Sequence, residues 1–479
     1  MVPNHPKYHH YIPRFILKTF ADNFLPTSSN TKYIATSTPG VFEPLDWRIV
    51  KLRGRKKGIK SKERNDKGGG ARGGARGDAG GEGSGVGGKG GGVGGEGGGV
   101  GGEGGGVGGG LQAGARPPRR EGSYYINVYQ VASHTIELND VAREYGIYDM
   151  YRDITSVDEM KFEKLLSKLE GTSSMFFRKI RSGEDLSLTR VQLEDMKKFL
   201  CIMMYRGEHR WREYHDGLLN FKTHGSLKIH MDNNHIKKLQ DVWFGNLKWF
   251  IKTPPSDIMD EYKKFISNEA ENASGGTTNT EYQGPIYATA LCEFGEMVPH
   301  YVCVWQAEEG SEFILSDNCF GAFEGNKGIP FHSFFIVSPR YAIVLVNRFY
   351  MSPPSSFERA ILSQQITRKS WFEEELHRNP ETVYMKGPLP EDAVESGFSP
   401  DDVFKYTRIV VPQQDVYKVN SIFLDCRDKS LTYKSTVCML KSLRFYDKVK
   451  SNSGLFNYEH DYTILKRKLF ADLNRTHSS

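Results

Sequence analysis

The chain has 479 residues, of which 38% are hydrophobic and 12% aromatic, and this composition excludes a wholly disordered protein. Its net charge of +6 comes from one segment, because residues 51–120 hold 15 Lys and Arg against 6 Asp and Glu. The remaining residues carry a net −3. The charge of the folded part therefore does not favour binding to nucleic acid.

The six cysteines include no C-x-x-C pair and no Cys and His at zinc-finger spacing, so we expect free thiols in a reducing compartment and no metal site. The start of the chain has no apolar stretch typical of a secretory signal. The most apolar run, Tyr341–Val346, is far shorter than the roughly 20 residues of a spanning helix. We expect no membrane association and a cytoplasmic or nuclear location.

Residues 1–50 indicate the start of a domain, and residues 51–122 indicate an insert within it. The insert begins with a basic run over residues 51–67, and residues 68–110 then hold 28 of the 51 glycines. A seven-residue glycine-rich unit with one valine occurs four times between Gly80 and Val107, which is too few apolar positions for a coiled coil. The composition predicts a disordered, flexible coil. Because 50 residues are too few for a core, the first segment must pack against the residues after the insert.

After the insert, apolar spacing predicts alternating groups of helices and strands. Helices are expected over Asp158–Arg181, Thr189–Tyr214, two segments between His235 and Ala273 broken at Pro254 and Pro255, Ser355–Glu375, Val416–Leu424 and Asp461–Leu473. Strands are expected over Tyr124–Gln130, His300–Gln306, Glu312–Leu315, Phe334–Val337, Tyr341–Val346 and Leu431–Lys434. Helices dominate and strands cluster late, so the expected class is α+β. Residues 1–50 and 123–475 would form one split, mostly helical domain.

The densest signature lies near the N-terminus, where residues 10–20 read His-Tyr-Ile-Pro-Arg-Phe-Ile-Leu-Lys-Thr-Phe. Pro13 suits the first position of a short helix, with an apolar face formed by Ile16, Leu17 and Phe20. The pattern H-Y-x-P-x-F-x-L-(K/R)-x-F resembles the hallmark of the family called domain of unknown function 4238.

Further stretches resemble the same family in the same order, and together they span most of the chain outside the insert. They are the acidic helix from Phe162 to Glu170, the helix from Lys198 to Arg206, the element Phe313–Asn318, the element Ile336–Pro339 and Asn420. The sequence departs from the family at Cys319, where proline is usual, and at Ile336 and Val337, which replace Pro-Leu. The family carries no established activity, so the resemblance implies a fold and no reaction.

The motif residues nevertheless suggest a site. His10 and Asp317 form a candidate acid–base pair, and Arg14, Arg206 and Asn318 are candidates for binding an anionic substrate. In this hypothesis the protein is an enzyme acting on a phosphate-containing or nucleic-acid substrate. The alternative is a non-catalytic protein-interaction or regulatory module in which His10 caps a helix and Asp317 and Asn318 close a turn.

No motif indicates a cofactor or a covalent nucleophile: there is no G-x-S-x-G and no G-x-x-x-x-G-K-[ST]. The basic arm Lys51–Arg76 could contact nucleic acid or act as a nuclear localisation signal. The alternative for this arm is a solvated charge run that keeps the glycine coil extended.

Overall fold

The structure, a computed structural model, describes residues 7–21, 123–152, 160–217, 228, 231–232, 235–273, 288–298, 300–326, 329–347, 370–372, 376, 381–383, 401–450 and 460–478. The insert expected at 51–122 lies outside these residues, as does most of the helix expected over Ser355–Glu375.

The N-terminal segment packs into the body of the fold beyond the insert. Strand β1 (Tyr8–His10) pairs antiparallel with β4 (Gly146–Tyr148), so that His10 lies opposite Gly146. Gly146 is needed here, because a Cβ atom would lie 2.5 Å from the His9 carbonyl oxygen. Helix α1 (Arg14–Leu17) comes next and buries Ile16 and Leu17 in the core.

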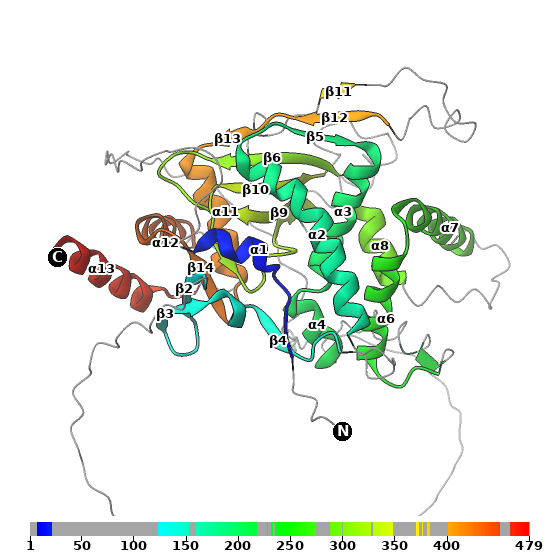
Figure 1. Cartoon of the computed structure of the whole chain (residues 1–479), viewed down its shortest axis with the longest axis horizontal. Helices are drawn as coiled ribbons and strands as arrows, with labels where there is room; N and C mark the ends of the chain where they lie inside the picture. Colours follow the sequence, from blue (N-terminus) through cyan, green and yellow to red (C-terminus); the bar gives the residue numbers. More distant parts are fainter. Residues whose placement is uncertain are drawn as a thin grey trace, which may run out of the picture. The chain divides into compact units, whose positions relative to one another are not determined.

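Within the described residues, the β-structure consists of three sheets and one two-stranded pair (Figure 1). The largest sheet has the order β13-β6-β10-β9-β8, formed by Ile409–Val411, Tyr301–Ala307, Tyr341–Val346, Ile329–Ser338 and Phe323–Asn326. A second sheet has the order β3-β2-β14-β7, formed by Thr135–Asp140, Tyr125–Gln130, Ser430–Tyr433 and Leu315–Ser316. The third has the order β11-β12-β5, formed by Glu381–Val383, Val403–Tyr406 and Leu186–Thr189. The apolar runs of β6 and β10 are almost wholly buried, as expected of central strands.

Helices pack against these sheets and against one another (Figure 1). They are α2 (Lys161–Ser182), α3 (Arg190–Tyr205), α4 (Glu208–His215), α6 (Leu239–Lys252), α7 (Pro255–Ala273), α8 (Ala288–Met297), α11 (Gln413–Cys426), α12 (Thr436–Lys450) and α13 (Thr463–Ser478). Helix α3 contacts α2, α4, α6, α7 and α8.

Two adjacent lysines on α3 donate hydrogen bonds to the C-terminal ends of neighbouring helices. Lys197 donates to the carbonyl oxygens of Val298 and His300, which come after α8. Lys198 donates to the carbonyl oxygens at the end of α6. Cations at these positions satisfy the last carbonyls and complement the helix dipoles.

Most of the expected helices and strands are present, with three corrections. The helix expected over Thr189–Tyr214 is two helices, because Thr189 forms a capping box at the start of α3 and Gly207 is extended before α4. The strand expected over Glu312–Leu315 is reduced to β7. Before it, the Glu312 carbonyl and the Ile314 N–H form hydrogen bonds with the side chain of Asn420 instead of with a neighbouring strand. Strands also precede α2, so the fold is a mixture of helices and several small sheets rather than helices with late strands only.

Candidate functional site

His10 lies at the end of β1 and its side chain faces a backbone group. Its Nδ1 atom is 2.9 Å from the carbonyl oxygen of Glu144, a residue of the loop before β4. Burial lowers the pKa of His10 to about 4, and the nearby Arg14 and Arg206 guanidinium groups act in the same direction. The ring is therefore neutral at pH 7 and donates one hydrogen bond to the backbone.

Arg206 comes directly after α3, and its side chain is only 1% exposed. Its Nε atom donates to the Tyr11 carbonyl oxygen at 3.0 Å, and Nη2 donates to the His10 carbonyl oxygen at 3.0 Å. Its Nη1 atom lies 2.6 Å from Glu170 Oε1 on α2. The guanidinium thus joins three elements and uses its forked geometry on protein acceptors.

Asp317 and Asn318 come directly after β7, and both contact the segment between α11 and β14. Asp317 accepts from the backbone N–H groups of Asp428 at 3.0 Å and Lys429 at 2.6 Å. Asn318 Nδ2 donates to the Cys426 carbonyl oxygen at 2.6 Å. Burial raises the pKa of Asp317 to about 6, although the two backbone hydrogen bonds oppose the shift.

The five expected site residues fall into two groups. His10, Arg14 and Arg206 lie near one another, with Arg14 exposed at the start of α1. Asp317 and Asn318 form the second group, and both bond to backbone groups between the end of α11 and β14. Each buried member already has local hydrogen-bond partners, which favours a role in holding the fold.

Tyr11 connects the two groups, and the sequence alone assigned it no role. Its phenol hydrogen-bonds to the Glu208 carboxylate and lies near Asp317, and burial together with these charges raises the pKa of Tyr11 far above its usual value. Glu208 is the first residue of α4 and forms an ion pair with Lys429. We call Tyr11, Glu208, Asp317 and Lys429 the Tyr11 cluster. The signal that could have found Tyr11 was its position inside the N-terminal motif.

The low pKa of His10 predicts a pH dependence of stability. An unfolded histidine titrates near pH 6.5, so between about pH 6.5 and 4 the unfolded chain binds a proton that folded His10 does not. The contribution of neutral His10 to the free energy of unfolding is complete above pH 6.5 and is lost as the pH falls towards 4.

The variant His10→Asn keeps a donor for the Glu144 carbonyl and removes the protonation of residue 10. From pH 7 to pH 5, the unfolding free energy of wild type should fall by roughly 1–2 kcal/mol more than that of His10→Asn, as measured in urea titrations. Equal losses in the two proteins would contradict the assignment.

Helix α4 leads from the Tyr11 cluster to a pocket. Glu208 begins the helix in the cluster, and Arg212 one turn later forms an ion pair with Asp428 at 2.8 Å. The last residues of the helix, Tyr214 and His215, line the pocket. The N-terminal motif therefore positions one wall of this pocket through α4.

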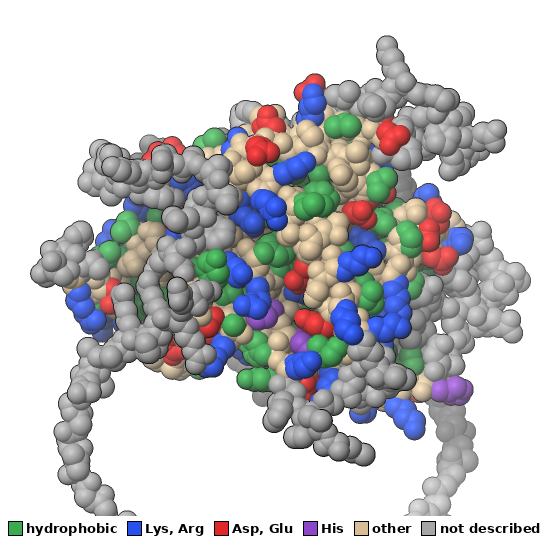
Figure 2. All heavy atoms as spheres, viewed as in Figure 1, with side chains coloured by type: hydrophobic (Ala, Val, Ile, Leu, Met, Phe, Trp, Pro, Cys, Tyr) green, Lys and Arg blue, Asp and Glu red, His purple; other side chains and the backbone are tan. Residues whose placement is uncertain are grey.

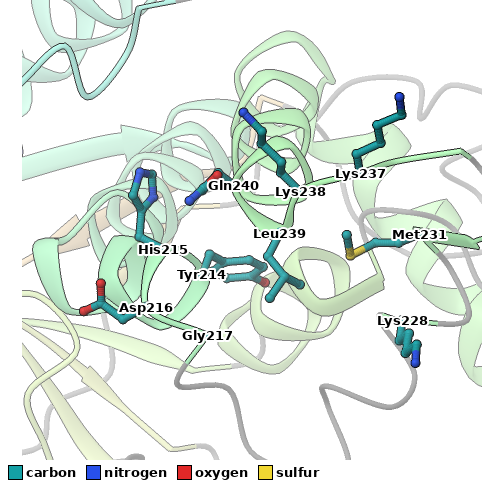
Figure 3. Close-up of a pocket in the computed structure, with 10 residues that line it drawn as sticks. All are labelled: Tyr214, His215, Asp216, Gly217, Lys228, Met231, Lys237, Lys238, Leu239 and Gln240. Carbon is teal, nitrogen blue, oxygen red and sulfur yellow. The ribbon is translucent and has the colours of Figure 1, made fainter. Parts of the chain in front are cut away.

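The pocket, which we call the α4–α6 pocket, has a volume of about 520 Å³. Its walls come from the end of α4, from the residues before α6 and from the first residues of α6 (Figure 3). They are Tyr214, His215, Asp216, Gly217, Lys228, Met231, Lys237, Lys238, Leu239 and Gln240. Tyr214 and Leu239 meet in the middle of the view in Figure 3, with Met231 beside them and the lysines further out.

The pocket is electropositive. Lys228, Lys237 and Lys238 are exposed and form no ion pair with the residues that the structure describes, whereas Asp216 is bound by Arg212 at 3.3 Å. Burial lowers the pKa of His215, whose ring stacks on Trp211 with centroids 3.8 Å apart. The three ammonium groups therefore supply the charge of this site at neutral pH.

The first turn of α6 borders the pocket. Lys238 occupies the cap position and makes no side-chain cap hydrogen bond. The N–H groups at the start of a helix lack partners within the helix and favour anions. Leu239 and Gln240, the first two residues of α6, both line the pocket.

Metal-binding and membrane-spanning features do not occur in the ranges that the structure describes. No cluster of three or more His, Cys, Asp or Glu side chains in these ranges could hold a metal ion. None of the helices described is long and apolar enough to cross a membrane. Five cysteines are described and all are buried, and they are Cys201, Cys303, Cys319, Cys426 and Cys438.

Comparison with known proteins identifies the family. No curated protein and no solved structure matches the chain. Residues 8–436 match a family described as a protein of unknown function, DUF4238, and this match covers the N-terminal motif, Glu170, Arg206, Asp317 and Asn420. The chain therefore belongs to the domain of unknown function 4238 family.

Proposed function

We propose that the protein binds a phosphate-containing small molecule in the α4–α6 pocket. The observation that carries this proposal is the set of three lysines without ion-pair partners among the described residues, placed around a cavity of about 520 Å³ at the start of α6. A cavity of this size is typical of small-molecule sites, which range over roughly 300–1,000 Å³. Ammonium groups and helix N–H groups together are a common combination for binding phosphate.

The apolar wall of the pocket can contact the uncharged part of such a ligand. Tyr214, Leu239 and Met231 offer an aromatic ring and two aliphatic side chains to a group that is not charged. A nucleoside monophosphate combines a phosphate with a flat ring and matches this division of the pocket. Inorganic phosphate alone would use the cationic part only, so the two ligands can be told apart by affinity.

The acid–base roles of His10 and Asp317 and the anion-binding roles of Arg14, Arg206 and Asn318 stay predictions. What speaks for them is the pKa of Asp317 near 6, which lies in the range of a general acid or base. What speaks for a structural role is that Arg206 and Asp317 are buried and bonded to the protein itself. Nucleic-acid contact through Lys51–Arg76 is likewise a prediction.

Calorimetric titration of the full chain tests the binding proposal. We expect adenosine monophosphate to bind more tightly than adenosine or inorganic phosphate alone. The double substitution Lys237→Glu and Lys238→Glu should weaken binding of the nucleotide at least tenfold, which corresponds to about 1.4 kcal/mol.

A matched control is available on the neighbouring helix α7. Lys263 and Lys264 are also adjacent and exposed, with side chains 72% and 69% accessible. The double substitution Lys263→Glu and Lys264→Glu makes the same change in net charge away from the pocket and should leave affinity unchanged. Equal affinities for both double variants, or no binding of any phosphate compound by wild type, would overturn the proposal.

A further inference from the structure

Helix α12 carries a row of outward-facing side chains, three of which are cations. Val437, Lys441, Arg444 and Lys448 lie at successive spacings of four, three and four residues, so they share one side of the helix. Val437 is 47% exposed, and Arg444 and Lys448 are exposed as well. The opposite side, which includes Met439 and Leu443, is buried in the core.

Helix α13 carries a second row beside the first. Leu465 and Leu469 are buried, while Ile464, Arg467 and Phe470 lie at three-residue spacing on the outer side. Ile464 is 43% exposed and Phe470 is 41% exposed. Around α13, Figure 2 shows blue Lys and Arg side chains beside green hydrophobic ones.

The two rows meet at a cation–aromatic contact. The guanidinium carbon of Arg444 lies 5.2 Å from the centre of the Phe470 ring. Arg467 is one turn before Phe470 on the same helix. Helices α12 and α13 therefore present one joint surface, the α12–α13 surface, made of Val437, Lys441, Arg444, Lys448, Ile464, Arg467 and Phe470.

This surface is strongly positive, unlike the folded part as a whole. Residues 436–450 and 460–478 contain eight Lys and Arg against three Asp. The three acidic groups are engaged: Asp447 by Lys450 and Lys466, Asp472 by Arg475, and Asp461 by Thr463. No ion pair to Arg444 or Arg467 occurs among the described residues, so their charge is available to a partner.

We propose that the α12–α13 surface binds single-stranded nucleic acid. Such partners are held by cations that track the phosphates and by aromatic rings on which bases stack. Arg444, Arg467 and Phe470 provide both components within one contact region. An anionic membrane fits less well, because insertion requires a continuous apolar face and the leucine face of α13 is turned inward. The site differs from the arm Lys51–Arg76 and from the α4–α6 pocket, so it can be tested separately from both.

The test is fluorescence anisotropy of the full chain with labelled 20-nucleotide oligo-dT and oligo-U. If the four cations of the surface contact phosphates, log K should fall with log salt at a slope of about −3 between 50 and 200 mM salt. Arg444→Glu with Arg467→Glu should weaken binding at least tenfold and reduce the slope by about 1.4. Phe470→Ala should weaken binding about fivefold or more with the slope unchanged, because it removes stacking and no charge.

Two control variants separate this surface from other basic regions. Arg178→Glu with Lys179→Glu makes the same charge change on the exposed side of α2 and should bind as wild type does. Neutralising Arg55, Lys56 and Lys57 in the arm should leave the effects of the α12–α13 substitutions in place. Melting curves check that each variant is folded.

Three results would overturn the proposal. One is binding that is lost in the arm variant and unchanged in the Arg444 and Arg467 variant. Another is equal weakening by the α2 control. The third is sedimentation with phosphatidylserine vesicles that depends on Phe470, together with no binding of either oligonucleotide; that result would assign the surface to a membrane.

Discussion

Replacement of Arg206 by methionine should lower the free energy of unfolding by about 3–5 kcal/mol, because it removes a buried charge together with one ion pair and two hydrogen bonds. The side chain is 1% exposed and donates to the carbonyl oxygens of His10 and Tyr11 while pairing with Glu170. Methionine fills similar space but leaves the half-buried Glu170 carboxylate and two carbonyls without their donors. Urea denaturation monitored by circular dichroism measures the loss.

Arg212→Met is the matched control, since Arg212 is likewise engaged, by two ion pairs, but is 33% exposed. We expect it to cost less than about 1 kcal/mol. If Arg206→Met does not fold, Arg206→Lys can replace it, because lysine keeps the charge and part of the hydrogen bonding. We expect its loss of unfolding free energy to lie between the losses expected for Arg206→Met and Arg212→Met. In the Arg206 variants, backbone hydrogen exchange should increase first in β1, because Arg206 donates to the His10 carbonyl oxygen in this strand. Equal costs for Arg206→Met and Arg212→Met would refute the role given to Arg206.

Replacement of Asn420 by alanine should be similarly severe. Asn420 is fully buried on α11, and its Oδ1 atom accepts from the Ile314 N–H at 3.1 Å. Its Nδ2 atom donates to the Glu312 carbonyl oxygen and to Ser442 Oγ, both at 2.8 Å. Each buried partner left unsatisfied costs about 1–3 kcal/mol, so we expect a total loss of roughly 3–5 kcal/mol.

Asn318→Ala serves as the comparison for Asn420→Ala. Asn318 makes one hydrogen bond, to the Cys426 carbonyl oxygen, and is only partly buried. We expect a loss of about 1 kcal/mol from it in the same denaturation experiment. If the two alanine variants lost equal stability, the three-bond role of Asn420 would be wrong.

The sequence predicted individual elements better than the contacts between them. The helix expected over Asp158–Arg181 is α2, and Gly183 caps it in the left-handed conformation at φ +84°. The break between α3 and α4 was missed, because the apolar spacing continues through Arg206 and Gly207 and periodicity alone does not register a single extended glycine. The edge strand β7 was overestimated because its neighbours are satisfied by Asn420, a residue about a hundred positions away.

The site was harder to predict for the same reason. The family resemblance marked both Glu170 and Arg206, yet nothing in their positions showed that they pair. The α4–α6 pocket depends on three lysines that belong to no motif, and the packing of α4 against α6 is what brings them to the same cavity as Tyr214 and His215. Tyr11 was visible in the motif, but its neighbours Glu208 and Asp317 come from distant segments.

We propose that the N-terminal motif builds the fold while the α4–α6 pocket binds the ligand. The rise in melting temperature on adding adenosine monophosphate tests it most directly, measured at pH 7 on wild type, on His10→Asn and on Lys237→Glu with Lys238→Glu. A ligand that binds only the folded state raises the melting temperature according to its affinity. We predict the wild-type rise in His10→Asn and little or no rise in the lysine variant. A rise that is abolished in His10→Asn and retained in the lysine variant would contradict the account and place the ligand at the motif.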